Sequence, residues 1–587
     1  MKVFRLKWLA SCFGFILLVG GALSCAGPEP VAEQEGQSKG TDRILPAFTD
    51  ITAEAGLGEF WYENGATGEK WFPESMGSGG GFIDYDGDGW IDILLVGGGT
   101  WSEREDELVP ALWLYRNNGD GTFSLRTDEA GLGGIFAYGL GISVADYDND
   151  GDEDFYFTTL HDNMLFRNDG GRFTDVGQAS GAIGEPAWST NAIFFDADQD
   201  GWLDLYVGNY VDWSIEDDLW CTLDGVTKSY CTPELYSGIP SRFYRNNGDG
   251  TFIDQTEAAG FLPAPGKTLG AAELDFNKDG WPDLVVACDT QRNLLYENNG
   301  DGTFTEKGAI SGIAYDENGG ARAGMGIDVG IVDHTGEETV FVGNFSREMI
   351  GVFRHVGNGL FIDRAAVSKI GRPSLLTLTF GLFLFDPDLD GDLDLFTANG
   401  HVQVEIDHTE DGITYKEPPH LFINRGDGIF EDVAKAAGGV LSRPIVGRGA
   451  AYADIDRDGD QDILITTNNG PAYLWRNDQQ NGHFLRVQLE GRQSNRNAIG
   501  IRIVAVVGDR RMERRIRTGS SFLSQMEKTV TFGLGASTII DSLIIYWRNG
   551  RVARFADVGA DQEVRIVEGA DTLERQPLPG LVALAAP

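Results

Sequence analysis

Basic residues are scarce in this chain of 587 residues. Lysine and arginine total 46 against 90 aspartate and glutamate residues, so the formal net charge is −44. A surface of that sign repels the phosphate backbone, which excludes a nucleic-acid partner. The 7 histidines are scattered, and neither the His-Glu-x-x-His spacing nor the Gly-x-Ser-x-Gly elbow occurs. We therefore expect no catalytic residues.

Long apolar runs are missing beyond the N-terminus. The stretch from Trp8 to Leu23 follows Lys2, Arg5 and Lys7, which is the pattern of a secretion signal over residues 1–24. No later run is long and apolar enough to span a bilayer. Membrane contact is therefore expected only through an anchor at the N-terminus.

Cys25 ends the run Ala22-Leu23-Ser24-Cys25. This run resembles a bacterial lipoprotein cleavage site, with alanine where leucine is usual. The resemblance implies lipidation of Cys25, and the alternative is an ordinary signal peptide with an incidental cysteine. The segment 25–43 would be the lipidated cysteine and a polar tether without a core-forming pattern. We expect an exported protein, anchored at the outer membrane or cell surface, or otherwise secreted.

Cysteine is rare, with 5 residues, so the chain is not a disulfide scaffold. Cys221 and Cys231 lie close together and flank a turn-rich insertion. In an exported protein this spacing predicts a disulfide. Cys288 ends an apolar run and is predicted to be a buried, inert thiol.

Aspartate, by contrast, recurs in one kind of loop. In the copy from Asp84 to Asp92, carboxylates occupy loop positions 1, 3, 5 and 9, glycine occupies position 6, and an apolar run follows. Oxygen ligands at alternate positions of a tight loop are what Ca²⁺ prefers. The loop differs from an EF-hand, which runs twelve residues and closes on glutamate. The position-7 residue, here Trp90, is expected to add its backbone carbonyl.

Six intact copies predict about six Ca²⁺ sites. Five copies have four aspartates each, namely Asp84, Asp86, Asp88, Asp92; Asp146, Asp148, Asp150, Asp154; Asp196, Asp198, Asp200, Asp204; Asp386, Asp388, Asp390, Asp394; and Asp454, Asp456, Asp458, Asp462. The remaining copy has Asp275, Asn277, Asp279 and Asp283. A seventh copy is broken, because its ligand positions carry Ile331, Asp333, Thr335 and Thr339. We expect it to keep the fold and to lack the ion.

Two further sequence motifs recur seven times with the loop. One is a strand and hairpin such as Leu114 to Phe123, in which Asn-Gly and Asp-Gly supply positive φ for a tight turn. The other is a strand that begins with phenylalanine, as at Phe252. The array starts and ends in mid-unit, so it can close into a ring by completing one unit from both ends. We therefore predict an all-β chain with a seven-bladed β-propeller over residues 44–483.

The phrase Asp-x-Asp-x-Asp-Gly-x-x-Asp followed by an apolar strand resembles the calcium loops of FG-GAP/VCBS repeats, the family of the integrin α-chain propeller. That resemblance covers about three quarters of the chain. It implies that the loops bind Ca²⁺ on one face of the ring and that the ring is a binding platform.

The segment 484–569 contains four phrases that resemble the ASPIC/UnbV domain of the cartilage-acidic-protein family. The phrases begin at Ser494, Gly519, Phe532 and Ile544. We expect a small domain like a β-sandwich, followed by a tail over 570–587. Its arginines suit either a solvated strand face or a patch for an anion or acidic partner; they are Arg510, Arg511, Arg514, Arg515 and Arg517.

Two functions remain open from sequence. The first is a monomeric, calcium-stabilised surface module that binds a protein or glycan, and the second is a secreted calcium-dependent polysaccharide lyase or hydrolase. Four tryptophans between strands are candidates either for a ligand surface or for local packing; they are Trp101, Trp188, Trp213 and Trp220.

Overall fold

The computed structural model describes residues 45–101, 108–261, 266–478, 482–576 and 578. Within these residues β-strands dominate, and each of the five α-helices has four residues. None of the described helices has the length and apolar character needed to cross a bilayer. The predicted all-β class is confirmed.

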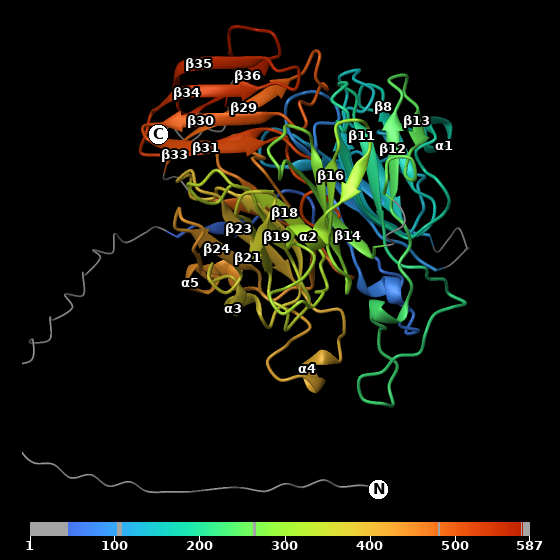
Figure 1. The fold of residues 1–587 in the computed structure, drawn as a ribbon. Helices are drawn as coiled ribbons and strands as arrows, with labels where there is room; N and C mark the ends of the chain where they lie inside the picture. Colours follow the sequence, from blue (N-terminus) through green and yellow to red (C-terminus); the bar gives the residue numbers. More distant parts are fainter. Residues whose placement is uncertain (1–44, 102–107, 262–265, 479–481, 577, 579–587) are drawn as a thin grey trace, which may run out of the picture. The chain divides into compact units, whose positions relative to one another are not determined.

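Residues 48–477 form seven four-stranded antiparallel sheets (Figure 1). The first three contain β2 (Gly80–Ile83), β3 (Asp92–Val96), β4 (Leu112–Asn117) and β5 (Phe123–Leu125); β6 (Gly139–Ala145), β7 (Asp154–Thr159), β8 (Met164–Asn168) and β9 (Phe173–Asp175); and β10 (Ser189–Phe195), β11 (Asp204–Asn209), β12 (Arg242–Asn246) and β13 (Phe252–Asp254).

The next three sheets contain β14 (Thr268–Leu274), β15 (Asp283–Cys288), β16 (Leu294–Asn298) and β17 (Phe304–Glu306); β18 (Ile327–Gly330), β19 (Thr339–Val342), β20 (Gly351–His355) and β21 (Phe361–Asp363); and β22 (Thr379–Phe385), β23 (Asp394–Asn399), β24 (His420–Asn424) and β25 (Phe430–Asp432). The last sheet combines β26 (Gly447–Ala453), β27 (Asp462–Thr467), β28 (Tyr473–Asn477) and β1 (Phe48–Asp50).

Short helices lie in the connections between these strands. They are η1 (Phe72–Ser75), α1 (Gly177–Ser180), η3 (Pro233–Leu235), α2 (Gly308–Ser311), α3 (Gly371–Ser374), α4 (Ile406–Thr409), α5 (Ala434–Ala437) and η4 (Gly439–Ser442).

The sheets form a closed ring. Each first strand packs on the next in the order β2, β6, β10, β14, β18, β22, β26, and β26 packs on β2. Strand β1 pairs with β28 through Phe48 and Asn477, so both ends of the array complete one sheet. This closure joins the two ends of the array, and the radial repeat leaves only short, protected sheet edges, as predicted for a propeller.

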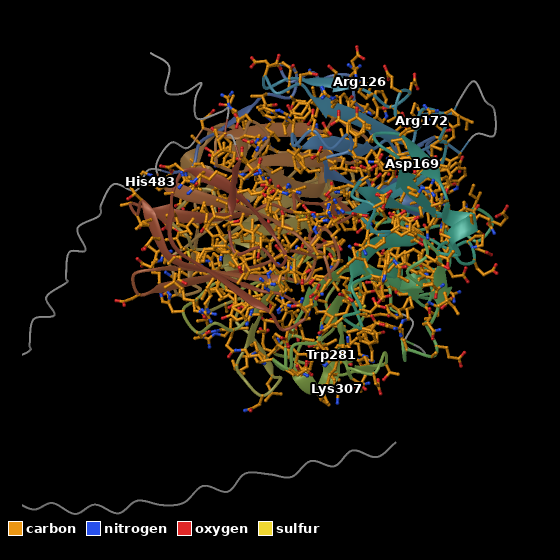
Figure 2. The ribbon with its side chains drawn as sticks, turned by 90° about the horizontal axis from the view of Figure 1, so that it is seen from above. Arg126, Asp169, Arg172, Trp281, Lys307 and His483 are labelled. Carbon is orange, nitrogen blue, oxygen red and sulfur yellow. A yellow bond between two sulfur atoms is a disulfide. The ribbon has the colours of Figure 1, made fainter. Side chains whose placement is uncertain are left out.

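Apolar residues hold neighbouring sheets together. For example, Ile83 and Val96 of one sheet share a buried cluster with Val144, Phe155 and Phe157 of the next. Strand β22 is buried along its whole length, which is expected for a strand covered on both faces. Charged side chains such as Arg126, Asp169 and Lys307 lie at the rim (Figure 2).

The antiparallel order separates the connections onto two faces of the ring. The loops between first and second strands, which contain the aspartate copies, share one face with the outer hairpins; we call it the aspartate face. The loops between second and third strands emerge on the opposite face. These include residues 210–241 and the segment that contains α4, which lies at the lower end in Figure 1.

The C-terminal part forms two more four-stranded sheets. Their strands are β29 (His483–Glu490), β30 (Arg502–Val507), β31 (Arg510–Arg515), β33 (Val530–Gly535), β34 (Ile539–Tyr546), β35 (Val552–Gly559), β36 (Gln562–Val567) and β37 (Glu574–Gln576). The orders are β33-β29-β36-β37 and β31-β30-β34-β35, and both sheets contribute to one buried cluster. Strand β37 lies in the stretch predicted to be a tail.

The segment 516–528, between β31 and β33, fills the centre of the ring. Its strand β32 (Ser524–Gln525) pairs in parallel with β2. Ser521 bridges Ile327 of β18, and Thr518 Oγ1 donates to the Phe194 carbonyl of β10 at 2.7 Å. Contacts with first strands around the circle place this segment on the axis.

Phe522 is the apolar anchor of the central segment. It is fully buried and its ring lies 4.9 Å from that of Phe380. We predict that Phe522→Ala costs ~3–5 kcal/mol, because it leaves a cavity on the axis. Calorimetry checks this, with Phe136→Ala as control because Phe136 is 47% exposed. Equal melting shifts in the two variants would contradict an anchoring role.

Candidate metal centres on the aspartate face

Each aspartate loop leaves a first strand and enters a second. In the first copy, the Asp84 carboxylate accepts the Gly89 backbone N–H at 3.1 Å, which curls the loop around the position-1 side chain. Gly89 has φ 84°, a left-handed conformation in which a side chain would be strained. The position-6 glycine is therefore required by the turn.

The structure brings three carboxylates together in five of the six intact loops. Among the described residues, oxygens within 4.8 Å of one another come from Asp84, Asp86 and Asp92; Asp146, Asp148 and Asp154; Asp196, Asp198 and Asp200; Asp386, Asp388 and Asp390; and Asp454, Asp456 and Asp462. The sixth loop is not gathered in this way. There Asn277 Nδ2 donates to Asp279 at 2.8 Å, so the amide nitrogen rather than its oxygen faces the neighbouring ligand.

The position-9 aspartate ties the loop to its own sheet. Asp204 Oδ1 accepts the Asn246 N–H at 2.8 Å and Oδ2 accepts the Ala197 N–H at 3.2 Å. The same pair of bonds recurs in the other copies, except that Pro387 has no N–H to give and Asp394 Oδ2 has no hydrogen-bond partner. Each position-9 oxygen keeps a lone pair for a metal.

Burial and mutual repulsion act on these carboxylates. Burial, followed by the neighbouring Glu153, raises the pKa of Asp84 to about 7. Burial also raises the pKa of Asp283 to about 8, and the pKa of Asp454 lies well above its usual value. Both carboxylate oxygens of Asp196 are buried without a hydrogen-bond partner. These oxygen-only donor sets, with unsatisfied negative charge, fit a hard divalent cation such as Ca²⁺.

An asparagine directly before the turn, to which sequence reasoning gave no role, links each loop to the preceding sheet. Asn246 Nδ2 donates to the Tyr147 and Leu203 carbonyls at 2.9 and 3.0 Å. Equivalent bonds to a preceding loop come from Asn117, Asn168, Asn298, Asn424 and Asn477. The sequence did contain a signal for this role, because asparagine is the last residue of the third strand in six of seven copies.

The broken copy replaces these features. Asp333 pairs with Arg354 at 2.6 Å, so a guanidinium meets the one remaining carboxylate. His355 stands where the other copies have the linking asparagine. Glu338 nevertheless accepts the backbone N–H of Asp275 in the preceding loop at 3.0 Å. The copy therefore keeps a part in the ring although its metal ligands are lost.

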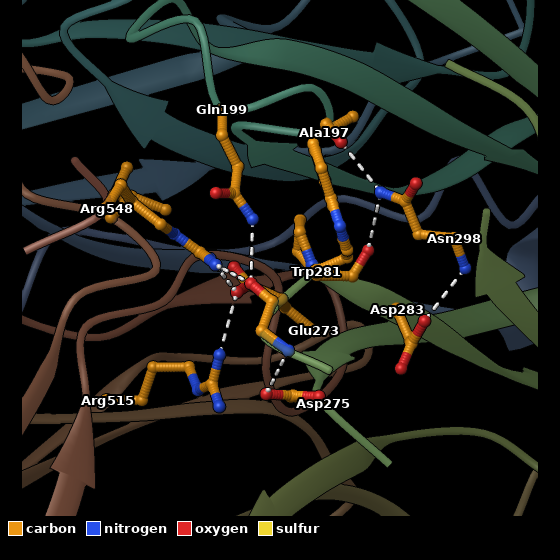
Figure 3. Close-up of polar contacts among 12 residues, drawn as sticks. Ala197, Gln199, Glu273, Asp275, Trp281, Asp283, Asn298, Arg515 and Arg548 are labelled. Carbon is orange, nitrogen blue, oxygen red and sulfur yellow. Dashed lines mark hydrogen bonds and ion pairs between the residues drawn. The ribbon is translucent and has the colours of Figure 1, made fainter. Parts of the chain in front are cut away.

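Arginines of the C-terminal sheets meet acidic residues of the ring. Arg515 and Arg548 converge on Glu273 at 3.3 and 2.7 Å (Figure 3). Arg517 pairs with Asp328 at 3.1 Å, so the acidic partner lies within the same chain. Arg510 approaches Asp392 and Arg514 bonds the Gly391 carbonyl, whereas Arg511 pairs with Glu513 of its own strand.

The C-terminal sheets also contact the aspartate loops directly. Asn497 accepts the Asp146 backbone N–H at 2.6 Å. Arg486 is buried and lies 3.3 Å from Asp454, 2.8 Å from Glu527 and 3.0 Å from Glu563. Sequence alone could not predict these contacts, because they join segments that are distant in the chain and no repeated sequence pattern indicates them.

The remaining predicted residues lie elsewhere. Cys221 and Cys231 form the predicted disulfide, with an S–S distance of 2.05 Å, and Cys288 is the buried free cysteine. Cys25 lies outside the described residues. Three of the four tryptophans pack in one cluster, and Trp220 is 59% exposed; the packed ones are Trp101, Trp188 and Trp213.

We predict that Asn246→Ala destabilises the ring by ~2–3 kcal/mol, because two buried carbonyls lose their donor. Asn247→Ala is the matched control, since Asn247 is exposed and its amide bonds only Thr251 within the same turn. Its cost should be under ~0.5 kcal/mol. Denaturant unfolding of both variants gives the comparison, and equal midpoints would contradict the inter-sheet link.

Comparison with known families gives two matches. The model described as FG-GAP-like repeat matches residues 84–157, 146–207, 233–286, 275–337 and 386–465. The model described as ASPIC and UnbV matches residues 491–573. Together the first set covers more than half of the chain, including all the aspartate loops.

Similar proteins agree with these matches. Cartilage acidic protein 1 of Homo sapiens is 23% identical over 554 residues, covering 88% of this chain and 74% of that protein. Its Xenopus tropicalis counterpart is 22% identical over 549 residues, covering 87% and 75%. A solved Agrocybe aegerita lectin that recognises non-reducing terminal N-acetylglucosamine is 17% identical, with TM-score 0.37 over 66% of this chain and 85% of that one. A score this low supports no inference about a ligand. The chain belongs to the FG-GAP-like repeat family and carries an ASPIC and UnbV domain at its C-terminal end.

Proposed function

We propose that this protein is an exported calcium-binding β-propeller that acts as a protein- or glycan-binding module at a cell surface. The observation that carries the calcium assignment is the set of gathered, buried carboxylates on one face of the ring. Carboxylate and carbonyl oxygens suit Ca²⁺, and six to eight of them complete its shell. Position-7 carbonyls, such as that of Trp90, would add to the aspartates.

The binding surface is proposed on the opposite face. The C-terminal sheets occupy the aspartate face through Asn497, Arg486 and Arg515, so a large partner has the other side of the ring available. The connection 210–241, which we call the disulfide loop, emerges there and exposes apolar side chains: Ile215 at 44%, Leu219 at 39%, Trp220 at 59%, Leu223 at 42% and Val226 at 81%.

A rigid, exposed apolar loop is typical of an interaction surface. The Cys221–Cys231 bridge restrains its ten-residue span, so less conformational freedom is lost when a partner binds. Trp220, directly before Cys221, suits either a protein pocket or the apolar face of a sugar, since tryptophan is enriched among binding hot spots. The calcium-dependent lyase or hydrolase is not proposed, because no arrangement among the described residues favours it.

Anchoring completes the proposal. Lipidation at Cys25, followed by the polar tether of residues 26–43, would hold a monomeric propeller at the outer membrane or cell surface. Oxidising conditions outside the cytoplasm suit the Cys221–Cys231 disulfide.

Chelation of calcium is predicted to lower the melting temperature by several degrees, because ions that bind only the folded loops stabilise them by mass action. Removing one site with Asp196→Asn and Asp198→Asn should lower the calcium stoichiometry by one in calorimetric titration. Asp333→Asn, in the broken copy, should leave the stoichiometry unchanged. An unchanged melt in excess chelator would contradict the assignment.

The loop surface is tested by Trp220→Ala. A glycan array and a pull-down with solubilised cell-surface proteins first identify the ligand, and titration then measures its affinity. We expect Trp220→Ala to weaken binding at least tenfold, as loss of an exposed hot-spot residue does. Leu360→Ala is the control, because Leu360 is 46% exposed in an outer hairpin on the aspartate face. Equal affinities would place the partner elsewhere.

A further inference from the structure

A cavity of about 90 Å³ lies at the base of the disulfide loop. It is bounded by segments that follow different second strands, with Tyr210 after β11, Asp289 after β15 and Phe345 after β19. The disulfide loop adds Glu234 to its lining. The cavity therefore lies on the face opposite the aspartate loops, where several blades meet.

Aromatic and aliphatic side chains form most of the wall. The Phe72 ring stacks on Tyr236 at 5.3 Å and lies 5.8 Å from Tyr210. Met325 and Phe380 line the inner side. Such a wall receives an alkyl chain, and its ring faces attract a cation at close range.

Carboxylates converge on the same cavity. Asp289 is 7% exposed, and one of its oxygens accepts the Tyr210 hydroxyl at 2.6 Å. Its other oxygen, Oδ1, accepts no hydrogen bond from any described residue. Thr290 Oγ1, which also lines the cavity, is buried without a partner. Glu348 accepts the Ala323 N–H at 2.7 Å through one oxygen.

Negative charge exceeds positive charge around the cavity. Lys267 acts electrostatically on Asp289, and its Nζ donates to the Pro233 carbonyl at 2.6 Å. Arg322, near Glu348, pairs with Asp363 at 2.8 Å. Burial, with Glu234 and Glu348 nearby, raises the pKa of Asp289 to about 7. A cation placed in the cavity would relieve this repulsion.

We propose that the cavity binds a primary ammonium group carried on a short alkyl chain, as in a lysine side chain or a small polyamine. Ammonium has three donors, which match Asp289 Oδ1, Thr290 Oγ1 and the carboxylate of Glu348. A bare divalent ion fits poorly, because it needs six or more oxygens and the phenyl and thioether walls offer none. The proposal deepens the proposed binding function, since the cavity adjoins the exposed loop.

The first experiment titrates the calcium-loaded full chain with butylammonium at pH 8, followed by calorimetry. Butylammonium should bind at least tenfold more tightly than 1-butanol, which has a similar shape and no charge. Equal affinities would overturn the proposal, because the wall alone would then account for binding. Saturable binding of neither compound would also overturn it.

Matched variants locate the site. Asp289→Asn keeps the shape and removes the charge, and should weaken butylammonium binding at least tenfold. Glu348→Gln is the second variant, used if Asp289→Asn does not fold, and should weaken binding at least threefold. Asp254→Asn, at an exposed carboxylate of β13, is the control and should bind like the parent. Unchanged affinity in the folded cavity variant would overturn the proposal.

Two further titrations distinguish the sources of the ammonium group. N-acetyl-lysine methylamide stands for a lysine of a partner protein, and putrescine stands for a free polyamine. If either compound binds more tightly than the other, the result supports the ammonium site and identifies the source of the ammonium group. Butylammonium binding can be measured without a partner. If butylammonium does not bind but a partner binds in a Trp220-dependent way, only the ammonium site is rejected and the proposed binding module stands. A positive titration without any partner would reject only the proposed module.

Discussion

Burial of negative charge on one face of the ring governs this structure. Loop carboxylates lose water when the sheets close, so the fold requires positive charge beside them. Hairpin residues such as Arg116, which lies 2.5 Å from Asp86, supply some of it, and Arg486 and Arg515 of the C-terminal sheets supply more. The proposed Ca²⁺ ions would supply the rest. The C-terminal sheets are therefore part of the charge balance of the ring.

This balance gives the two faces different roles. The aspartate face is covered by the C-terminal sheets, and the central segment around Phe522 fills the axis from that side. On the opposite face, two long connections between second and third strands, residues 210–241 and 400–419, carry the disulfide loop and α4. The proposed metal sites and the ion pairs with the C-terminal arginines thus lie on one side of the ring, and the exposed disulfide loop lies on the other.

Sequence predicted the features that are local and repeated. The nine-residue loops, the hairpins, the Cys221–Cys231 bridge and the broken copy all follow from short patterns. Closure followed from an array that starts and ends in mid-unit. The link made by Asn246 was missed because the Asn-Gly turn begins at the next residue, Asn247, and leaves Asn246 without a predicted role. Two features could not be predicted: the pairing of Arg515 with Glu273 and the insertion of residues 516–528 into the ring. Both depend on contacts between segments hundreds of residues apart, which a repeat in the sequence does not indicate.

Closure of the last sheet also sets the order in which the molecule can be made. Phe48 of β1 pairs with Asn477 of β28, so the first strand of the ring to leave the ribosome waits for the last strand of the ring. Such distant closure is slow, because chain entropy is lost before contacts form. Until then the nascent blades carry open edges, which favour aggregation. Biosynthesis of this ring therefore demands that the growing chain be kept apart from its neighbours until the last blade has been translated.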